Sequence, residues 1–176
     1  MKHIAQLIGF SIFGFILHEL AHLLAALSLG HEAIIRINSV SVLPNPPTFD
    51  RILIDLAGPL MTIALAAVGL WGVMSRNSVM GFNLLVAMTA QRSLAAGVSL
   101  LANPNDEYRI GEALGIGVWT VHLAVLVVLG GMLFSAISKV RPGWMYLLWA
   151  WIGISIGVSL AVFGEPYLPS MHFGST

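Results

Sequence analysis

The chain has 176 residues, of which 57% are hydrophobic and only 9% are charged, and its formal net charge is +0. A soluble domain usually carries about 25% charged residues, so this composition excludes a water-soluble globule. Intrinsic disorder is excluded because disordered chains are poor in apolar residues, and the absence of cysteine excludes a disulfide-stapled domain. The balanced charge gives no indication of a nucleic-acid partner. The composition therefore predicts an integral membrane protein with the lipid bilayer as its surroundings.

Five apolar stretches are long enough to cross a bilayer, which takes roughly 20 residues in a helix. They run over residues 4–29, 52–74, 79–101, 113–137 and 144–163. We therefore expect about five transmembrane helices joined mostly by short connections.

The connection between the first two expected spans is the longest. Within it, residues 34–42 (IIRINSVSV) alternate apolar and polar side chains and are rich in β-branched residues. This pattern is typical of a strand or a small hairpin. The sequence therefore predicts an all-α polytopic membrane protein with a short strand or hairpin after the first helix. We expect one domain over residues 1–176, with a core at 4–116 and additional spans at 113–163.

The first expected span contains an HExxH motif, His18-Glu19-Leu20-Ala21-His22. Residues four apart lie on one face of a helix, so both imidazoles can reach the same metal ion. A catalytic zinc site needs nitrogen ligands, an open coordination position and a carboxylate base, and Glu19 provides that carboxylate. The alternative is a hydrogen-bonded His–Glu–His cluster between helices, but such contacts contribute only about 0.6–2 kcal/mol. We therefore predict one zinc ion per chain, bound by His18 and His22, with Glu19 as the catalytic base.

A catalytic zinc site takes a third protein ligand. The alternation of the spans places the segment between the third and fourth spans on the same side of the membrane as the end of the first. This segment, residues 103–107 (NPNDE), predicts an irregular backbone, which is tolerated at membrane depth only where it lines a cavity. Asp106 is our first choice for the third ligand and Glu107 the second. Alternatively, the two acids belong to a solvated loop or a helix N-terminus.

These residues resemble a known family. A first-span HExxH, the sequence Gly58-Pro59-Leu60 at the start of the next span and a downstream Asn/Pro/Asp segment are similar to the site-two protease family of intramembrane zinc metalloproteases. The similarity extends from about Phe15 to Gly111. The resemblance implies that zinc is bound by His18, His22 and Asp106 and that Glu19 is the catalytic base.

Two positions depart from the family pattern. Thr62 stands where the family usually has asparagine, and Glu107 follows Asp106 where the family usually has glycine. Both positions bear on substrate positioning and oxyanion stabilisation more than on metal binding. The candidate accessory residues of the site are Thr62, Asn103, Glu107 and His122.

Other polar residues in the expected spans also need partners, because charges at membrane depth are costly. We expect Asp55 to pair with Arg92 in a structural ion pair, with a catalytic role as the alternative. We expect His122 to join two helices by a hydrogen bond, with a supporting or transition-state role in the site as the alternative. The strand-like segment has a specific use in a protease, since an exposed strand edge can hold a substrate in extended form. Its candidate substrate-binding residues are Ile35, Ile37 and Val40. The alternative is a short amphipathic loop at the membrane interface.

We therefore expect a multi-pass metalloendopeptidase that hydrolyses peptide bonds of transmembrane or membrane-anchored protein substrates, in the cell (cytoplasmic) membrane of a prokaryote. Two alternatives come from other classes. One is a non-catalytic membrane binding protein that retains the protease fold, which the two departures favour and the intact Glu19 disfavours. The other is a metal carrier that uses the same histidines.

Overall fold

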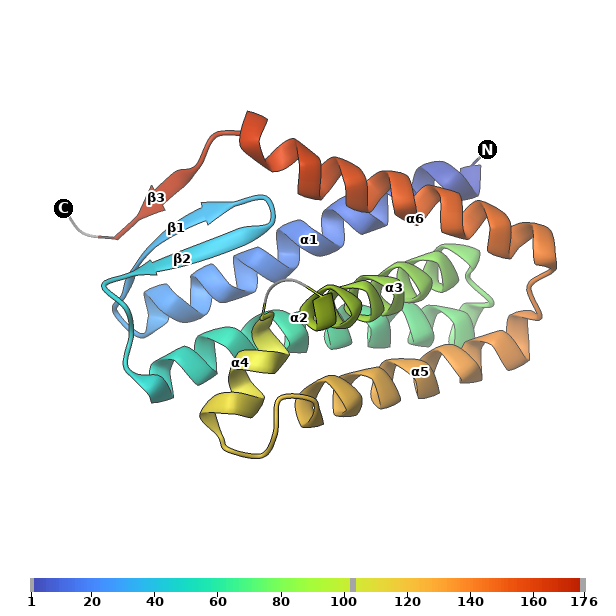
Figure 1. Ribbon diagram of the computed structural model, residues 1–176. Coiled ribbons are helices and arrows are strands. Elements are labelled where there is room, and N and C mark those ends of the chain that lie inside the picture. The colour runs from blue at the N-terminus through green and yellow to red at the C-terminus, as the bar shows by residue number, and fades with distance from the viewer. Residues whose placement is uncertain (1, 102–103, 175–176) are drawn as a thin grey trace.

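The computed structural model describes residues 2–101 and 104–174 of the chain (Figure 1). In chain order the elements are α1 (Lys2–Ser28), β1 (Glu32–Arg36), β2 (Ser39–Leu43), α2 (Thr48–Arg76), α3 (Val79–Leu101), α4 (Asp106–Ala113), α5 (Thr120–Val140), α6 (Trp144–Gly164), the 3-10 helix η1 (Glu165–Tyr167) and β3 (Met171–Phe173). Most of the described chain is therefore helical, with a small sheet at one end of the bundle.

Helix α1 lies at the centre of the bundle. It packs against α2 and α3 on one side and along α6 on the other, while α5 covers the far side of α2 and α3 (Figure 1). Its contact with α6 depends on small residues, since a Cβ at Gly157 would lie 2.6 Å from the Cβ of Ser11. Such close contacts between small residues are how helices associate where the surroundings are apolar.

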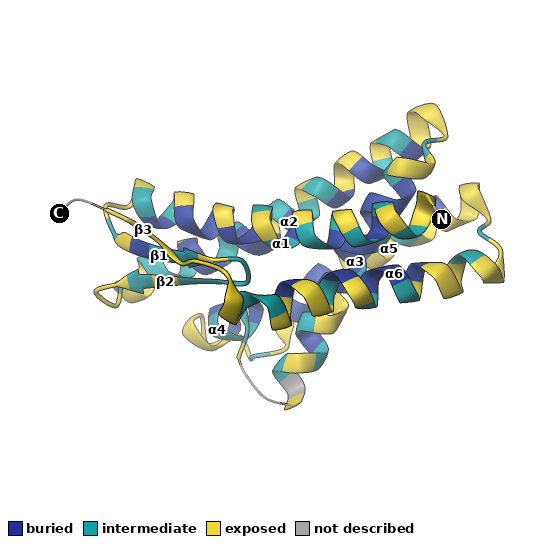
Figure 2. Cartoon of the chain, turned by 90° about the horizontal axis from the view of Figure 1, so that it is seen from above, coloured by how far each residue is buried: buried dark blue, intermediate teal, exposed yellow. Residues whose placement is uncertain are grey.

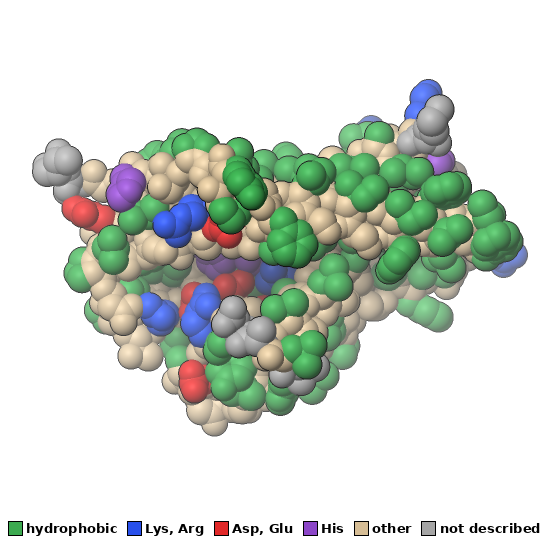
Figure 3. All heavy atoms as spheres, turned by 45° about the horizontal axis from the view of Figure 1, so that its top comes forward, with side chains coloured by type: hydrophobic (Ala, Val, Ile, Leu, Met, Phe, Trp, Pro, Cys, Tyr) green, Lys and Arg blue, Asp and Glu red, His purple; other side chains and the backbone are tan. Residues whose placement is uncertain are grey.

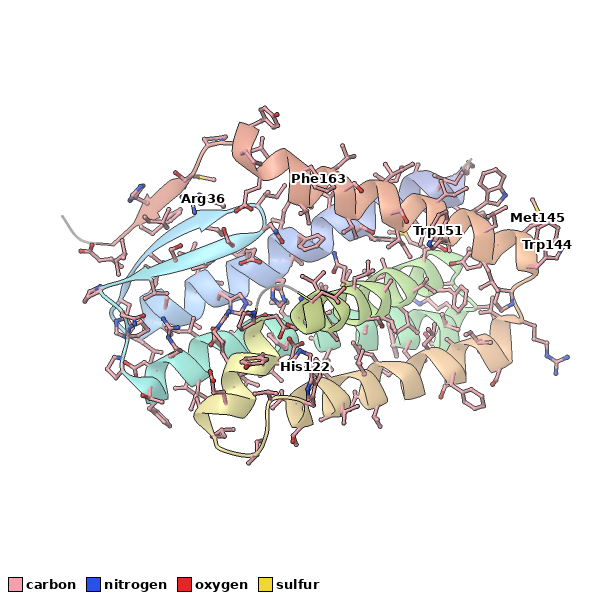
Figure 4. All side chains as sticks on the ribbon, viewed as in Figure 1. Arg36, His122, Trp144, Met145, Trp151 and Phe163 are labelled. Carbon is pink, nitrogen blue, oxygen red and sulfur yellow. The ribbon has the colours of Figure 1, made fainter. Side chains whose placement is uncertain are left out.

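The buried core and the outer surface are both apolar. Phe82, Leu85 and Met88 of α3 pack against α2 and α5 in the main buried cluster. Outside, Trp144, Trp151 and Phe163 of α6 are largely exposed (Figure 4). Exposed residues recur along several of the helices (Figure 2). An apolar exterior of this extent fits a bilayer better than water.

Four of the described helices are long and apolar enough to cross a membrane: α1, α2, α5 and α6 extended through η1. The structure thus supports a membrane protein with one candidate span fewer than the five expected. Residues 79–101 do form a helix, α3, but it is not among the four. Gln91 and Arg92 lie in the middle of α3 and reduce its apolar character.

The expected fourth span, residues 113–137, was wrong at its start. Residue 113 ends α4, and turns containing Gly115 and Gly117, both with positive φ, separate it from α5 at Thr120. The expectation of an irregular backbone at Asp106 and Glu107 was also wrong. Both residues lie in the first turn of α4, where Asn105 caps the helix by accepting a hydrogen bond from the Tyr108 N–H at 3.1 Å.

The predicted hairpin is confirmed, and it belongs to a larger sheet. β1 and β2 pair antiparallel with Arg36 opposite Ser39, and β3 pairs with the other edge of β1, so the strand order is β2-β1-β3. β3 was not predicted. Ala33 and, beneath the hairpin, Leu23 and Ile54 form a second buried cluster that holds the sheet against α1 and α2.

Candidate metal centre

A cavity of about 700 Å³ lies at the sheet end of the bundle. Residues from α1, β2, α2, α3, α4 and α6 line it, and they include His18, Glu19, His22, Val40, Asp55, Arg92, Asp106 and Arg109. Figure 3 shows this face of the molecule hollowed, with histidine, acidic and basic side chains gathered in the hollow. The polar residues that the sequence distributes over three expected spans and the connection after the third therefore meet at one place.

Three side-chain atoms converge in this cavity. His18 Nε2 lies 3.1 Å from His22 Nε2 and 3.0 Å from Asp106 Oδ2, and His22 Nε2 lies 3.5 Å from the same carboxylate oxygen. Two ligands on a tetrahedral zinc ion with bonds of about 2.0–2.1 Å are about 3.3 Å apart. The three edges match that spacing, so His18, His22 and Asp106 form a group that could hold a metal ion.

The environment of His22 determines which ring nitrogen faces the group. Its Nδ1 lies 2.6 Å from the carbonyl oxygen of Ile54. A carbonyl can only accept, so Nδ1 carries the proton and donates it. In the neutral ring Nε2 then presents a lone pair to the group. Hydrogen bonds of this kind commonly orient metal-binding histidines.

Thr62 determines which ring nitrogen of His18 faces the group, as the Ile54 carbonyl does for His22. The Thr62 hydroxyl donates its hydrogen to the Gly58 carbonyl at 3.2 Å, which leaves its oxygen to accept from His18 Nδ1 at 3.1 Å. In its neutral form His18 therefore also directs an unprotonated Nε2 at the group. Two nitrogen lone pairs and a carboxylate oxygen thus face one another, an arrangement that favours a cation between them.

Gly58 makes room for this arrangement. A Cβ built at this position would overlap the rings of both His18 and His22. The residue lies on α2, where the helix approaches α1. Any side chain at position 58 would have to displace the imidazoles.

Two arginines surround Asp106. Arg109 binds both carboxylate oxygens of Asp55, at 2.9 and 2.8 Å, and also donates to Asp106 Oδ1 at 2.8 Å. The other carboxylate oxygen, Oδ2, is thereby left toward the histidines. Burial alone would lower the pKa of Arg109, but its bonds to Asp55 and the charges of both aspartates raise that pKa above its ordinary value. Burial alone would raise the pKa of Asp106. A ring that carries a proton on Nε2 donates it to Asp106 Oδ2, and these hydrogen bonds from His18 and His22 outweigh burial and hold that pKa well below its ordinary value.

Arg92 and Glu107 form a buried ion pair beside the group. Arg92 Nη1 lies 3.2 Å from Glu107 Oε1 and 3.4 Å from Asp106 Oδ2. The expected pairing of Asp55 with Arg92 is wrong, because Asp55 pairs with Arg109 and Arg92 pairs with the acids of α4. The geometry also selects Asp106 over Glu107 for the candidate metal group.

Glu19 lines the cavity but takes no part in this network. Its side chain is buried and makes no hydrogen bond with any residue that the structure describes. Because the carboxylate has no other partner among those residues, it is available to a water molecule in the cavity.

Of the remaining predicted site residues that the structure describes, some line the cavity and others do not. Val40 of β2 lines the cavity, whereas Ile35 lies on β1 and packs in the cluster beneath the sheet, and Ile37 lies in the hairpin turn. His122, at the start of α5, donates from Nδ1 to the Val118 carbonyl one turn earlier and is not among the cavity-lining residues (Figure 4). The expected hydrogen bond from His122 to another helix was wrong, because Nε2 has no partner among the described residues. Asn103 lies outside the described residues.

Arg109 is the residue that sequence reasoning missed. It follows Asp106 by three positions, so on a helix the two side chains share a face. The three-residue spacing is present in the sequence, but it indicates a shared face only on a helix, and we expected an irregular backbone at residue 106.

Comparisons with known proteins returned no match from protein-family models, from curated proteins or from solved structures. The relation to the site-two proteases therefore stays a prediction from the motif residues.

Proposed function

We propose that the protein is an intramembrane zinc metalloprotease of the site-two protease type. The observation that carries the proposal is the convergence of His18 Nε2, His22 Nε2 and Asp106 Oδ2 in the cavity that Glu19 also lines. The Glu19 carboxylate has no hydrogen-bond partner in the part of the chain that the structure describes. Two imidazoles and one carboxylate are a ligand set typical of catalytic zinc, and three protein ligands leave a position open for chemistry.

The role of each residue in the proposed reaction follows from its contacts. His18, His22 and Asp106 would hold the ion, which when bound supplies Lewis-acid polarisation of a carbonyl and a more acidic water. Glu19 takes a proton from the attacking water and later gives it to the leaving amine. Thr62 and the Ile54 carbonyl keep the two rings in the tautomers that ligation requires.

The substrate class is part of the proposal. Four candidate spans and an apolar exterior support an integral membrane protein. Its substrates would therefore be transmembrane or membrane-anchored peptides. β2 lines the cavity, and its edge away from β1 pairs with no described strand. An extended peptide added along that edge would lie beside the metal group.

The experiment compares the wild type with Glu19→Gln after purification in detergent. Bound zinc is measured by atomic absorption and cleavage by the products of a model transmembrane peptide. We expect one zinc per chain in both proteins and a cleavage rate at least about 10²-fold lower in the variant, because general acid–base catalysis contributes that much.

Glu112→Gln is the matched control, since Glu112 is an exposed acid of α4 that does not line the cavity. It should cleave like the wild type. Equal cleavage by Glu19→Gln would contradict Glu19 as the base. A wild type that binds zinc without cleaving any peptide would favour the non-catalytic alternative, and one that binds no zinc would contradict the metal site.

A further inference from the structure

Arg92 is a cation in the middle of α3, a helix that carries no other charged residue. It is 7% exposed and lines the cavity together with Glu19 and the metal group. A charge at such a position is costly and calls for a strong interaction to offset it. Its known partners provide only part of that interaction.

Arg92 leaves most of its donors unused. A guanidinium has five N–H groups, but the hydrogen bonds found among the described residues involve only Nη1. Nε is buried without a partner in the described chain, and no bond found there uses Nη2. The two bonds that exist are 3.2 and 3.4 Å long, against about 2.7–2.9 Å for a strong charge-assisted bond.

Arg109, the neighbouring arginine of the same cavity, provides the contrast. Its Nε and Nη2 bind Asp55, Nη2 also binds Asp106, and Nη1 donates to the Pro104 carbonyl. Every side-chain nitrogen of Arg109 thus has a hydrogen-bond partner. Nε and Nη2 of Arg92 have none among the hydrogen bonds found in the described residues.

Two other donors near the metal group have partners, whereas Asn105 Nδ2 is buried without one among the described residues. The Thr62 hydroxyl donates to Gly58, and Gln91 Nε2 donates to the Ser11 carbonyl at 2.5 Å. Arg92 therefore combines a position beside Asp106 in the cavity lining with an Nη2 that no hydrogen bond found among the described residues uses.

We propose that Arg92 is a catalytic residue that donates hydrogen bonds to the oxygen of the scissile carbonyl as negative charge develops on it. The inference rests on the proposed protease function. It assigns to α3 an electrophilic group in addition to the metal ligands on α1 and α4.

The step balances with the groups named. The water oxygen bonds to the carbonyl carbon while Glu19 takes a water proton, and the carbonyl π pair moves onto the oxygen, where Arg92 donates. When the C–N bond breaks, the oxyanion electrons restore the carbonyl, and the bonding pair stays on nitrogen, which takes the proton from Glu19. Arg92 transfers no proton and remains a cation throughout.

Kinetics and zinc content of Arg92 variants test the proposal. We expect Arg92→Met to retain zinc and to lower kcat by about 10²–10³-fold with little change in KM, as the loss of an oxyanion donor does. Arg92→Lys keeps a positive charge beside Glu107, but one ammonium cannot serve both Glu107 and the substrate oxygen, so kcat should still fall by about tenfold or more. Wild-type kcat in Arg92→Lys would overturn the proposal even if Arg92→Met did not fold.

A structural role for Arg92 is distinguished by the double variant Arg92→Met/Glu107→Gln, which removes both charges of the buried pair. Compared with Glu107→Gln alone, it should keep its zinc and still be at least about 10²-fold slower. A double variant as active as Glu107→Gln would overturn the proposal, since the arginine would then only neutralise Glu107.

A binding measurement separates this inference from the proposed function. A phosphinic peptide mimics the tetrahedral oxyanion, and its affinity should fall by about 10²-fold in Arg92→Met, while an uncleaved peptide bound to Glu19→Gln should lose little affinity when Arg92→Met is added. Failure of the wild type to cleave would overturn the protease proposal itself. Cleavage by the wild type with equal inhibitor affinity in both proteins would overturn only the role of Arg92.

Discussion

The hydroxyl of Thr62 connects the backbone of α2 to the first histidine of the metal group. Its single hydrogen is used on the Gly58 carbonyl, so its oxygen can only accept from His18. That acceptance keeps the proton on Nδ1 and the lone pair on Nε2, where a metal needs it. Thr62, which stands where the site-two proteases usually have asparagine, thus fixes the tautomer of His18 in this chain.

The first prediction replaces Thr62 with two residues of similar size. Thr62→Val keeps the shape but removes the acceptor, so the affinity for zinc should fall by about 10–100-fold. Thr62→Ser keeps the hydroxyl and should bind zinc like the wild type. Competition with a zinc-binding dye measures both, with helix content by circular dichroism as the control for folding. Equal affinity in Thr62→Val would show that the hydroxyl does not orient His18.

Helix α4 shows how a short element is held in place by charge. It has 8 residues, too few to be stable as an isolated helix in water. Arg109 ties it to α2 through Asp55 and at the same time holds Asp106. The position of Asp106, the third candidate metal ligand, therefore depends on an ion pair formed between two helices.

The second prediction is a double-mutant cycle on Asp55 and Arg109. Each alanine variant should lose about 1–2 kcal/mol of unfolding free energy, a range discounted because the arginine is partly exposed. The double variant should lose clearly less than the sum, because the second change removes a partner that is already missing. Denaturant unfolding in mixed micelles measures the three variants. Strict additivity would mean that the pair does not couple α2 to α4.

Some elements follow from local sequence and others do not. The HELAH helix and the hairpin at residues 34–42 have periodicities that can be read directly, and both are present. β3 has only three residues and is held by its pairing with β1, which is distant in the sequence. A local sequence pattern therefore does not predict it. The Asp55–Arg109 pair depends on how α4 is rotated against α2, which composition and spacing do not specify.

The membrane spans show the same limit. Hydropathy alone suggests a span at residues 79–101, and a helix does form there. The polar centre of that helix faces the cavity and the α4 acids, so Arg92 has neighbours that a hydropathy reading cannot anticipate. The two candidate histidine ligands, by contrast, could be predicted, because HExxH is defined by spacing within one helix. Choosing Asp106 over Glu107 needed the geometry of the folded chain.

The sheet and the cavity belong together at the scale of the whole molecule. β3 pairs with one edge of β1, and β2 lines the cavity with an outer edge that pairs with no strand in the described chain (Figure 1). Arg36 and Ser39 flank a two-residue turn and so form a hydrogen-bonded pair, which directs the backbone groups of Val40 away from β1. An added peptide strand would bond to those groups.

The third prediction uses this register. Val40→Pro removes an outward N–H while leaving the bonds between β1 and β2, so peptide cleavage should fall by about tenfold or more if substrates add to this edge. Val40→Thr keeps the N–H and serves as the matched control. The zinc content should be unchanged in both. Wild-type cleavage by Val40→Pro would rule out strand addition at β2.

The three acceptors contributed by α1 and α4 also affect the assembly of the bundle. Two ring lone pairs and a carboxylate oxygen at 3.0–3.5 Å repel one another, and a cation among them turns that repulsion into attraction. In a zinc protein of the proposed kind, only the packed bundle presents this set, so by mass action each tenfold rise in free zinc above the dissociation constant adds about 1.4 kcal/mol to its stability. The supply of free zinc would then govern how much of the protein is correctly assembled as well as how much of it is active.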